Sequence, residues 1–223
     1  MDKSLLNVGA VLPAAGNGVR FGEKKQLKYL ANKPLFFYAL NVFLNCKEIS
    51  EVVIVTNKED VEYVNKEIQS LKTKKSIKVI AGGFRRQDSV MNGCLTLSNS
   101  VQLVTIHDIV RPFVTNNLIL STILGCKDND GCIAALPSKD TVKEVKNLNI
   151  VRTIDRDKIW LAQTPQTFKK NTLLDAMTNH NSTDEASIVE AAGGMITVTE
   201  GSIMNFKITT VDDWKLAEKV IDG

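Results

Sequence analysis

The chain has 223 residues, of which 43% are hydrophobic, and a formal net charge of +3 from 28 cationic and 25 anionic side chains. Such a balance argues against a nucleic-acid-binding surface, which needs clustered cations. No apolar stretch approaches the roughly 20 residues that span a bilayer, and no signal peptide is apparent. We expect one domain, residues 1–223, in a cytoplasmic protein that binds neither nucleic acid nor membrane.

The four cysteines are scattered and show no C-x-x-C spacing: Cys46, Cys94, Cys126 and Cys132. A structural zinc site or a disulfide framework would need closer spacing or a smaller, cysteine-denser chain. We therefore expect reduced thiols in the core.

The first predicted element is a strand over residues 8–13, which runs into small residues, close glycines and cations. Small residues let a backbone approach a ligand closely, and the N–H groups of such a loop bind anions. Arg20 and Lys25 add a guanidinium and an ammonium group beside it. The pattern predicts a nucleotide-phosphate site at the end of the first strand.

The glycines of this loop, Gly16, Gly18 and Gly22, form G-x-G-x-x-x-G, which differs by one residue from the dinucleotide-binding fingerprint. That fingerprint also requires an acidic residue after the second strand, where Thr56 stands instead. A P-loop is excluded because Gly22 is not followed directly by lysine and serine or threonine.

Helical and strand patterns alternate after the loop. We expect helices over residues 34–46, 60–71, 89–97 and 116–124, and strands over residues 52–55, 77–81, 103–106 and 132–136. Such βαβ units predict a Rossmann-like α/β fold, in which a mainly parallel, doubly wound sheet carries helices on both faces.

Residues 138–163 interrupt the alternation. Two β-rich segments, 141–145 and 150–154, flank a turn-prone connector and predict a β-hairpin. No helix in this stretch covers its apolar side chains. We expect a projecting arm that packs on a second copy of the chain to form a homodimer, with packing on its own domain as the alternative.

The last third of the chain returns to helical and strand patterns. We expect helices over residues 171–177, 184–192 with Thr183 as N-cap, and 211–221, and strands over residues 195–199 and 205–208.

Polar residues gather at the ends of three predicted strands: the opening loop, residues 82–86, and His107 with Asp108. Ligands of parallel sheets bind at the carboxyl ends of the strands, so these polar residues should lie together at one edge of the sheet. Asp108 is a candidate Mg²⁺ ligand, since Mg²⁺ is held by one or two carboxylates and substrate phosphates. We interpret His107 as a core residue rather than a base.

Cations lie near the same strand ends, the hairpin or the glycine pairs, at Arg85, Arg86, Arg111, Arg156 and Lys207. As a set they would hold two phosphate-bearing substrates. That chemistry is phosphoryl or nucleotidyl transfer, in which a substrate anion is already a nucleophile and needs no general base.

Short motifs occur in a fixed order along the chain: Leu12-Pro13-Ala14-Ala15-Gly16-x-Gly18-x-Arg20, Lys25-Gln26, Gly82-Gly83-x-x-Arg86-x-Asp88-Ser89, His107-Asp108-x-x-Arg111-Pro112, Asp140-Thr141, Thr164-Pro165-Gln166, Thr183-Asp184-Glu185-Ala186 and Lys207. Together they resemble the 2-C-methyl-D-erythritol 4-phosphate cytidylyltransferases of the non-mevalonate isoprenoid pathway. These transferases join CTP and methylerythritol phosphate and release pyrophosphate.

The resemblance implies roles for individual residues. Catalytic residues would be Arg20, Lys25, Arg156 and Lys207, of which the first two would stabilise the α-phosphate at the transition state. Nucleotide-binding residues would be Pro13, Ala14, Ala15, Gly16, Gly18, Gly82, Gly83, Phe84, Arg86 and Ser89. Residues binding the polyol phosphate would be Asp108, Arg111, Thr141 and Thr164, with Asp108 also holding Mg²⁺ or another divalent cation. Thr141 and Arg156 would act across a homodimer.

Some positions depart from the family pattern. Lys24 stands where proline is usual, residues 27–29 replace the usual tyrosine after the glutamine, and Ile109 and Val110 replace a pair of small residues, which would narrow the substrate pocket. A cytidylyltransferase for another polyol phosphate, such as ribitol 5-phosphate, is the nearest alternative. A dinucleotide-dependent oxidoreductase, revealed by NAD(P)H binding, and a non-catalytic nucleotide-binding protein are more distant ones.

Overall fold

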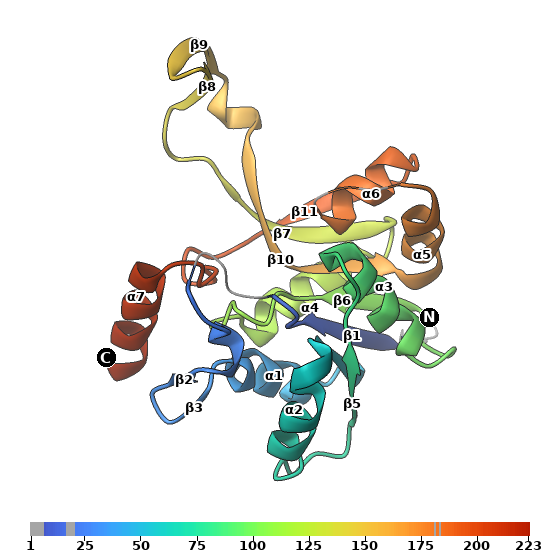
Figure 1. The fold of residues 1–223 in the computed structure, drawn as a ribbon. Coiled ribbons are helices and arrows are strands. Elements are labelled where there is room, and N and C mark those ends of the chain that lie inside the picture. The colour runs from blue at the N-terminus through green and yellow to red at the C-terminus, as the bar shows by residue number, and fades with distance from the viewer. Residues whose placement is uncertain (1–6, 17–20, 181, 183) are drawn as a thin grey trace.

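A seven-stranded sheet forms the centre of the computed structural model, which describes residues 7–16, 21–180, 182 and 184–223 (Figure 1). Its strand order is β11-β7-β10-β6-β1-β4-β5. The strands are β1 (Val8–Pro13), β4 (Ile49–Thr56), β5 (Ser76–Ala81), β6 (Leu103–Ile106), β7 (Gly131–Pro137), β10 (Trp160–Lys169) and β11 (Ile196–Glu200). Only β10 runs antiparallel to its neighbours, β6 and β7. The predicted mainly parallel sheet is confirmed.

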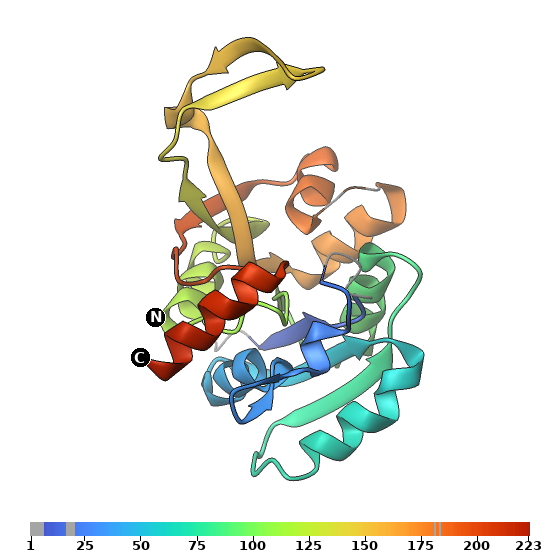
Figure 2. The same cartoon turned by 60° about the vertical axis from the view of Figure 1, so that its left-hand side comes forward.

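Helices cover both faces of the sheet, as expected for a doubly wound fold (Figure 2). On one face lie α1 (Phe36–Asn45), α2 (Val61–Ile68) and α4 (Asn116–Gly125); on the other lie α3 (Arg86–Thr96), α5 (Lys170–Asn179) and α6 (Glu185–Ala191). Successive side chains of a strand point to opposite faces. Accordingly, Ala10 and Leu12 of β1 join the first apolar cluster and Val11 joins the second.

A third, smaller cluster ties the C-terminal helix α7 (Val211–Asp222) to the loop after β1. Trp214 of α7 packs against Phe21, with 5.5 Å between ring centroids. Ile208 belongs to the same cluster, and its N–H donates to the Val110 carbonyl. Beneath α7 lies a two-stranded ribbon of β2 (Tyr29–Leu30) and β3 (Lys33–Pro34). The chain segment before α7 is therefore held close to the edge of the sheet where β1 ends.

The predicted hairpin forms an arm of β8 (Val142–Lys146) and β9 (Asn149–Ile154), which stands clear of the sheet in both views (Figures 1 and 2). The turn residues Asn147 and Leu148 have φ angles of 50° and 65°. Two consecutive positive φ angles match the twist of the paired strands. The chain returns to the sheet through a short 3-10 helix, η3 (Arg156–Lys158), and β10.

The sequence did not predict β10 or the β2–β3 ribbon. Four buried polar residues lie on β10, namely Gln163, Thr164, Gln166 and Thr167, so the segment lacks the apolar run that marks a central strand. The expected strand at residues 205–208 was wrong, because this segment is irregular.

Several helix starts differ from expectation, and the largest difference is at α3, which begins at Arg86 rather than at residue 89. Helix α1 begins at Phe36 because Pro34 belongs to β3. Asp184 caps α6 by accepting from the Ser187 N–H at 3.0 Å, whereas Thr183 lies outside the described residues.

All four cysteines are buried free thiols, as predicted. Within the described part of the chain, no helix is long and apolar enough to cross a membrane.

Candidate active site

The carboxyl ends of β1, β5 and β6 open onto one cavity of about 470 Å³. It is lined by Pro13, Ala14, Ala15, Gly16, Lys25, Gln26, Gly83, Phe84, Arg85, Arg86, Ser89, Asp108, Val110 and Lys207. The structure thus brings together most of the predicted nucleotide-binding residues with Lys25, Asp108 and Lys207. The predicted residues Gly18 and Arg20 lie outside the described residues.

The loop after β1 is held by its own polar contacts. The Ala14 N–H donates to the Val55 carbonyl at 2.6 Å, and Gln26 Nε2 donates to the Gly16 carbonyl at 3.0 Å. Gln26 lies on η1 (Lys25–Leu27) and is only 2% exposed. A buried amide that satisfies a loop carbonyl fixes the loop backbone. The carbonyl of Gly16 is therefore tied to Gln26, the residue that follows Lys25.

The loop after β5 packs tightly on the first one. A Cβ on Gly82 would lie 2.6 Å from Ser89 Oγ and 3.0 Å from the Ala15 side chain. A larger residue would push these groups apart, so glycine is required for the close approach. Ser89 Oγ also accepts from the Gly83 N–H at 3.1 Å. The two loops form one continuous wall of the cavity.

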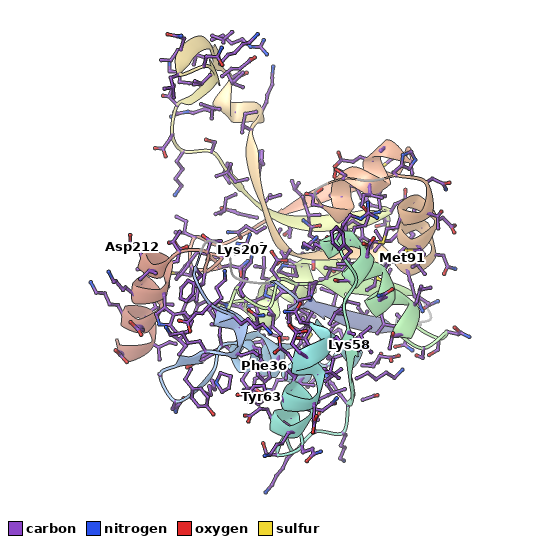
Figure 3. All side chains as sticks on the ribbon, viewed as in Figure 1. Phe36, Lys58, Tyr63, Met91, Lys207 and Asp212 are labelled. Carbon is purple, nitrogen blue, oxygen red and sulfur yellow. The ribbon has the colours of Figure 1, made fainter. Side chains whose placement is uncertain are left out.

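Four side chains of alternating charge form a chain of ion pairs, three of them at the wall of the cavity. Arg86 donates to Glu185 at 2.6 and 2.8 Å and to Asp108 Oδ1 at 3.1 Å. Lys207 donates from its ammonium group to Asp108 Oδ2 at 2.7 Å. Figure 3 labels Lys207 on the segment that joins β11 to α7. We call Glu185, Arg86, Asp108 and Lys207 the charge relay of the site.

Arg86 and Asp108 stabilise each other's charge, whereas at Glu185 burial outweighs Arg86 and raises the pKa of that carboxyl. Burial by itself would raise the pKa of Asp108, but Arg86 and Lys207 outweigh burial and hold that pKa well below its ordinary value. Burial likewise opposes the charged form of Arg86, and Asp108 and Glu185 outweigh it and raise the Arg86 pKa. Asp108 is therefore an anion at neutral pH.

A second cavity of about 180 Å³ lies on the other side of the relay. It is lined by Arg86, Asp108, Ala162, Gln163, Thr164, Gln166, Asp184 and Lys207. Three members of the relay therefore line both cavities. Two ligands placed in the two cavities would share these side chains.

His107 is a core residue, as predicted. Its side chain is fully buried, one ring nitrogen lies 3.1 Å from Thr164 Oγ1, and the other lies 3.1 Å from the Arg111 carbonyl. Burial lowers the pKa of His107 to about 4, so the ring is neutral at physiological pH. Thr164 Oγ1 in turn accepts from the Asp108 N–H at 3.0 Å. His107 and Thr164 thus position the backbone of Asp108.

Four of the predicted site residues that the structure describes line neither cavity, namely Gly82, Arg111, Thr141 and Arg156. Arg111 donates to the Asn205 carbonyl at 2.8 Å beneath the site. Thr141 and Arg156 are exposed and lie at the base of the arm, where Arg156 donates to the Lys139 carbonyl at 2.9 Å. The structure of a single chain does not bring these two residues to the cavities.

The donor groups fit a divalent cation only if a ligand supplies most of its shell. Among the described residues, no three His, Cys, Asp or Glu side chains gather as a metal-binding group. Asp108 is the single carboxylate among the residues that line the larger cavity. One carboxylate together with substrate phosphates is a usual Mg²⁺ environment.

Sequence reasoning missed Glu185 and Gln26 as site residues, although both lie within quoted motifs. The available signal for Glu185 was its place in the motif Thr183-Asp184-Glu185-Ala186, because its 1% exposure is known only from the fold. Its partner Arg86 is 99 residues away, so the pairing itself is a property of the fold.

We expect Glu185→Gln to lower the free energy of unfolding by about 2 kcal/mol, because it leaves half-buried Arg86 without its bidentate carboxylate. For a chain of this length that corresponds to a fall in Tm of roughly 4–8 °C. Circular dichroism recorded against temperature measures the Tm. The control is Glu190→Gln, which is exposed on the same helix and should leave Tm within about 1 °C. Equal Tm values for the two variants would contradict this role of Glu185.

Comparisons with known proteins point to one family over nearly the whole length of the chain. A family model described as 2-C-methyl-D-erythritol 4-phosphate cytidylyltransferase matches residues 8–222. A curated protein of that name from Alkaliphilus oremlandii is 35% identical over 229 residues, covering 98% of this chain and 97% of its own. Another, from Dictyoglomus thermophilum, is 37% identical over 222 residues, covering 96% of each chain.

Solved structures agree with the fold. The crystal structure of 4-diphosphocytidyl-2C-methyl-D-erythritol synthase from Anaerococcus prevotii has a TM-score of 0.88 at 27% identity and covers 100% of both chains. The structure of 2-C-methyl-D-erythritol 4-phosphate cytidylyltransferase from Thermus thermophilus has a TM-score of 0.78 at 26% identity, covering 97% of this chain and 100% of that one.

Proposed function

Because this chain belongs to the 2-C-methyl-D-erythritol 4-phosphate cytidylyltransferase family, we propose that its larger cavity binds CTP and its smaller cavity binds the polyol phosphate. The chain is a nucleotidyltransferase of isoprenoid precursor biosynthesis. It joins CTP and 2-C-methyl-D-erythritol 4-phosphate to give 4-diphosphocytidyl-2-C-methyl-D-erythritol and pyrophosphate. Residues 1–223 would act as one nucleotidyltransferase domain with the arm as an extension.

The observation that carries this assignment of cavities is the shared charge relay. Arg86, Asp108 and Lys207 line both cavities, so two phosphate-bearing ligands would meet there. The larger volume suits a nucleoside triphosphate and the smaller one a five-carbon polyol phosphate. Thr164 would complete the smaller cavity with its hydroxyl group.

The reaction needs positioning and charge stabilisation rather than a base. The phosphate of the polyol substrate is already an anion, and it attacks the α-phosphorus of CTP while the pyrophosphate oxygen leaves. Lys25 would stabilise the charge that develops on the α-phosphate, together with Arg20. Lys207 would hold the attacking phosphate between the cavities. The neutral, buried His107 takes no part in proton transfer.

We assign Mg²⁺ to the triphosphate side of the site. Asp108 would hold the ion jointly with CTP phosphates, because no protein cage surrounds it among the described residues. The bound ion would neutralise phosphate charge and favour departure of pyrophosphate. Asp108 has a second function without the metal, since it holds Arg86 and Lys207 in place.

The arm supports a homodimer as the functional unit. Its apolar residues are strongly exposed: Val145 at 53%, Leu148 at 97%, Ile150 at 65% and Val151 at 56%. A two-stranded hairpin is marginal on its own, and clustered exposed apolar groups mark an interface. A second copy of the chain would cover this surface and bring Thr141 and Arg156 to its partner's site.

The free thiols support a reducing, cytoplasmic location.

Mixing two inactive variants tests the shared site. We expect Lys25→Ala and Arg156→Ala each to be nearly inactive, and equal mixtures, after subunit exchange, to regain about one quarter of wild-type activity, since half of the dimers then hold one intact composite site. If Arg156 serves its own subunit, no mixture regains activity.

Sedimentation equilibrium of the wild-type chain measures the dimer itself. Val145→Lys and Ile150→Lys are the variants that should disrupt it, and Leu124→Lys is an exposed control on α4.

Pyrophosphate release with CTP across a panel of polyol phosphates tests the assignment of substrate. We expect kcat/KM for 2-C-methyl-D-erythritol 4-phosphate to exceed that for ribitol 5-phosphate by roughly 10²-fold or more, since a site built for one polyol leaves buried polar groups unpaired with another. Higher kcat/KM for ribitol 5-phosphate would assign the smaller cavity to that substrate instead. Omission of Mg²⁺ should abolish release.

A further inference from the structure

We propose that Phe84 is the stacking platform for the base of the nucleotide, and so a determinant of CTP affinity in this chain. The inference rests on the proposed binding of CTP in the larger cavity and goes further, because it assigns the stacking contact with the base to the ring of Phe84. Phe84 lines that cavity and its side chain is fully exposed, at 102%. A phenylalanine this exposed at the wall of a ligand cavity has an apolar face available for a ligand.

The backbone on both sides of Phe84 is fixed. The Gly83 N–H donates to Ser89 Oγ at 3.1 Å, and the Arg85 N–H donates to Asp88 Oδ2 at 3.0 Å. A Cβ on Gly83 would overlap the side chain of Asp88, so this turn requires glycine. Both contacts belong to the first turn of α3, which begins at Arg86. The ring is therefore presented from a rigid backbone, which reduces the entropy lost on binding.

The charges of the cavity indicate which end takes the base. Lys25, Arg86 and Lys207 line the cavity against the single carboxylate of Asp108, so these side chains carry a net positive charge that would attract the triphosphate. Arg85, next to Phe84, is paired with Asp88 at 2.7 Å, which offsets its charge. At the Phe84 end, the cavity wall offers the small residues Gly83 and Ala15 and the Ser89 hydroxyl. A flat heteroaromatic base matches this end, with the ring of Phe84 against its face.

Stacking on an aromatic side chain is tolerant of the base, because every base has a π-face. Phe84 would therefore strengthen binding of CTP and UTP alike, and discrimination between them would come from hydrogen-bonding groups of the loops. Inorganic tripolyphosphate carries the anionic part of the ligand without a base. It separates stacking from any effect on phosphate binding.

Calorimetric titration of Phe84→Ala tests the proposal. We expect the Kd for CTP to rise roughly 5- to 100-fold, and the Kd for tripolyphosphate to remain within about twofold of wild type. In turnover, KM for CTP should rise while KM for the polyol phosphate stays unchanged. Phe84→Tyr, which keeps the ring, should restore CTP binding to within about threefold. Leu95→Ala on α3, 61% exposed and outside the cavity lining, is the matched control.

The outcomes separate this inference from the proposed function. An unchanged Kd for CTP in Phe84→Ala, or an equal loss for CTP and tripolyphosphate, would overturn stacking while wild-type turnover still supports the cavity assignment. A shift of Phe84→Ala toward monomer in sedimentation would overturn it too, since the ring would then be a subunit contact. Failure of the wild-type chain to bind CTP would refute the proposed function itself.

Discussion

Lys25→Ala is expected to lower kcat by about 10²-fold or more, equivalent to about 2.7 kcal/mol of transition-state stabilisation. The Lys25 side chain lines the larger cavity, and its ammonium group lies 5.6 Å from the centre of the Phe21 ring. A fixed cation costs no reorganisation when charge develops on the α-phosphate. Initial rates of pyrophosphate release at saturating CTP and polyol phosphate measure kcat directly.

The neighbouring lysine provides a matched control. Lys24 has the same charge but points to η2 (Lys58–Asp60), where its ammonium group contacts Glu59 at 3.0 Å and Asp60 at 2.8 Å. It does not line the cavity, so Lys24→Ala should lower kcat less than about tenfold. Near-normal turnover of Lys25→Ala, or an equal loss in both variants, would remove Lys25 from the chemistry.

Lys207→Ala is expected to lower kcat/KM for the polyol phosphate by roughly 10- to 100-fold, with KM for CTP changed only a few-fold. Lys207 lies between the cavities and donates to Asp108 at 2.7 Å. Its loss removes the cation that we assign to the attacking phosphate and weakens the hold on Asp108. Steady-state kinetics with each substrate varied in turn separate the two constants.

A surface lysine on α7 serves as the comparison. Lys215 is exposed and pairs with Asp212 at 3.5 Å, so Lys215→Ala should leave all constants within about twofold of wild type. Unchanged kinetics with the polyol phosphate in Lys207→Ala would refute the assignment of Lys207.

Most helices and strands could be predicted from hydrophobic periodicity, because buried parallel strands and amphipathic helices leave strong local patterns in the sequence. The segment of β10 escaped prediction since its interior positions include Gln163, whose partners lie elsewhere in the chain, and Gln166, whose amide donates to the Gln163 carbonyl. Gln163 donates to the Ser202 carbonyl at 2.9 Å, for example. Such pairing depends on the folded chain and has no signature in a local window.

The site was predictable at the level of strand ends but not of contacts. Glycines and charges after β1, β5 and β6 indicated where ligands bind. The relay could not be foreseen, because Lys207 and Asp108 are 99 residues apart. The roles predicted for individual site residues all remain predictions, among them those of Gly18, Arg20, Thr141 and Arg156. The first two lie outside the described residues, and the last two line neither cavity of a single chain.

The central claim is that the relay brings the polyol phosphate to the α-phosphorus of CTP. Phosphorus NMR of the reaction with 2-C-methyl-D-erythritol 4-phosphate carrying ¹⁸O in its phosphate tests it most directly. We expect ¹⁸O in the oxygen that bridges the two phosphorus atoms of the product, which shifts both resonances, and pyrophosphate free of label. Label in the pyrophosphate, or no isotope shift on the cytidine-side phosphorus, would contradict it.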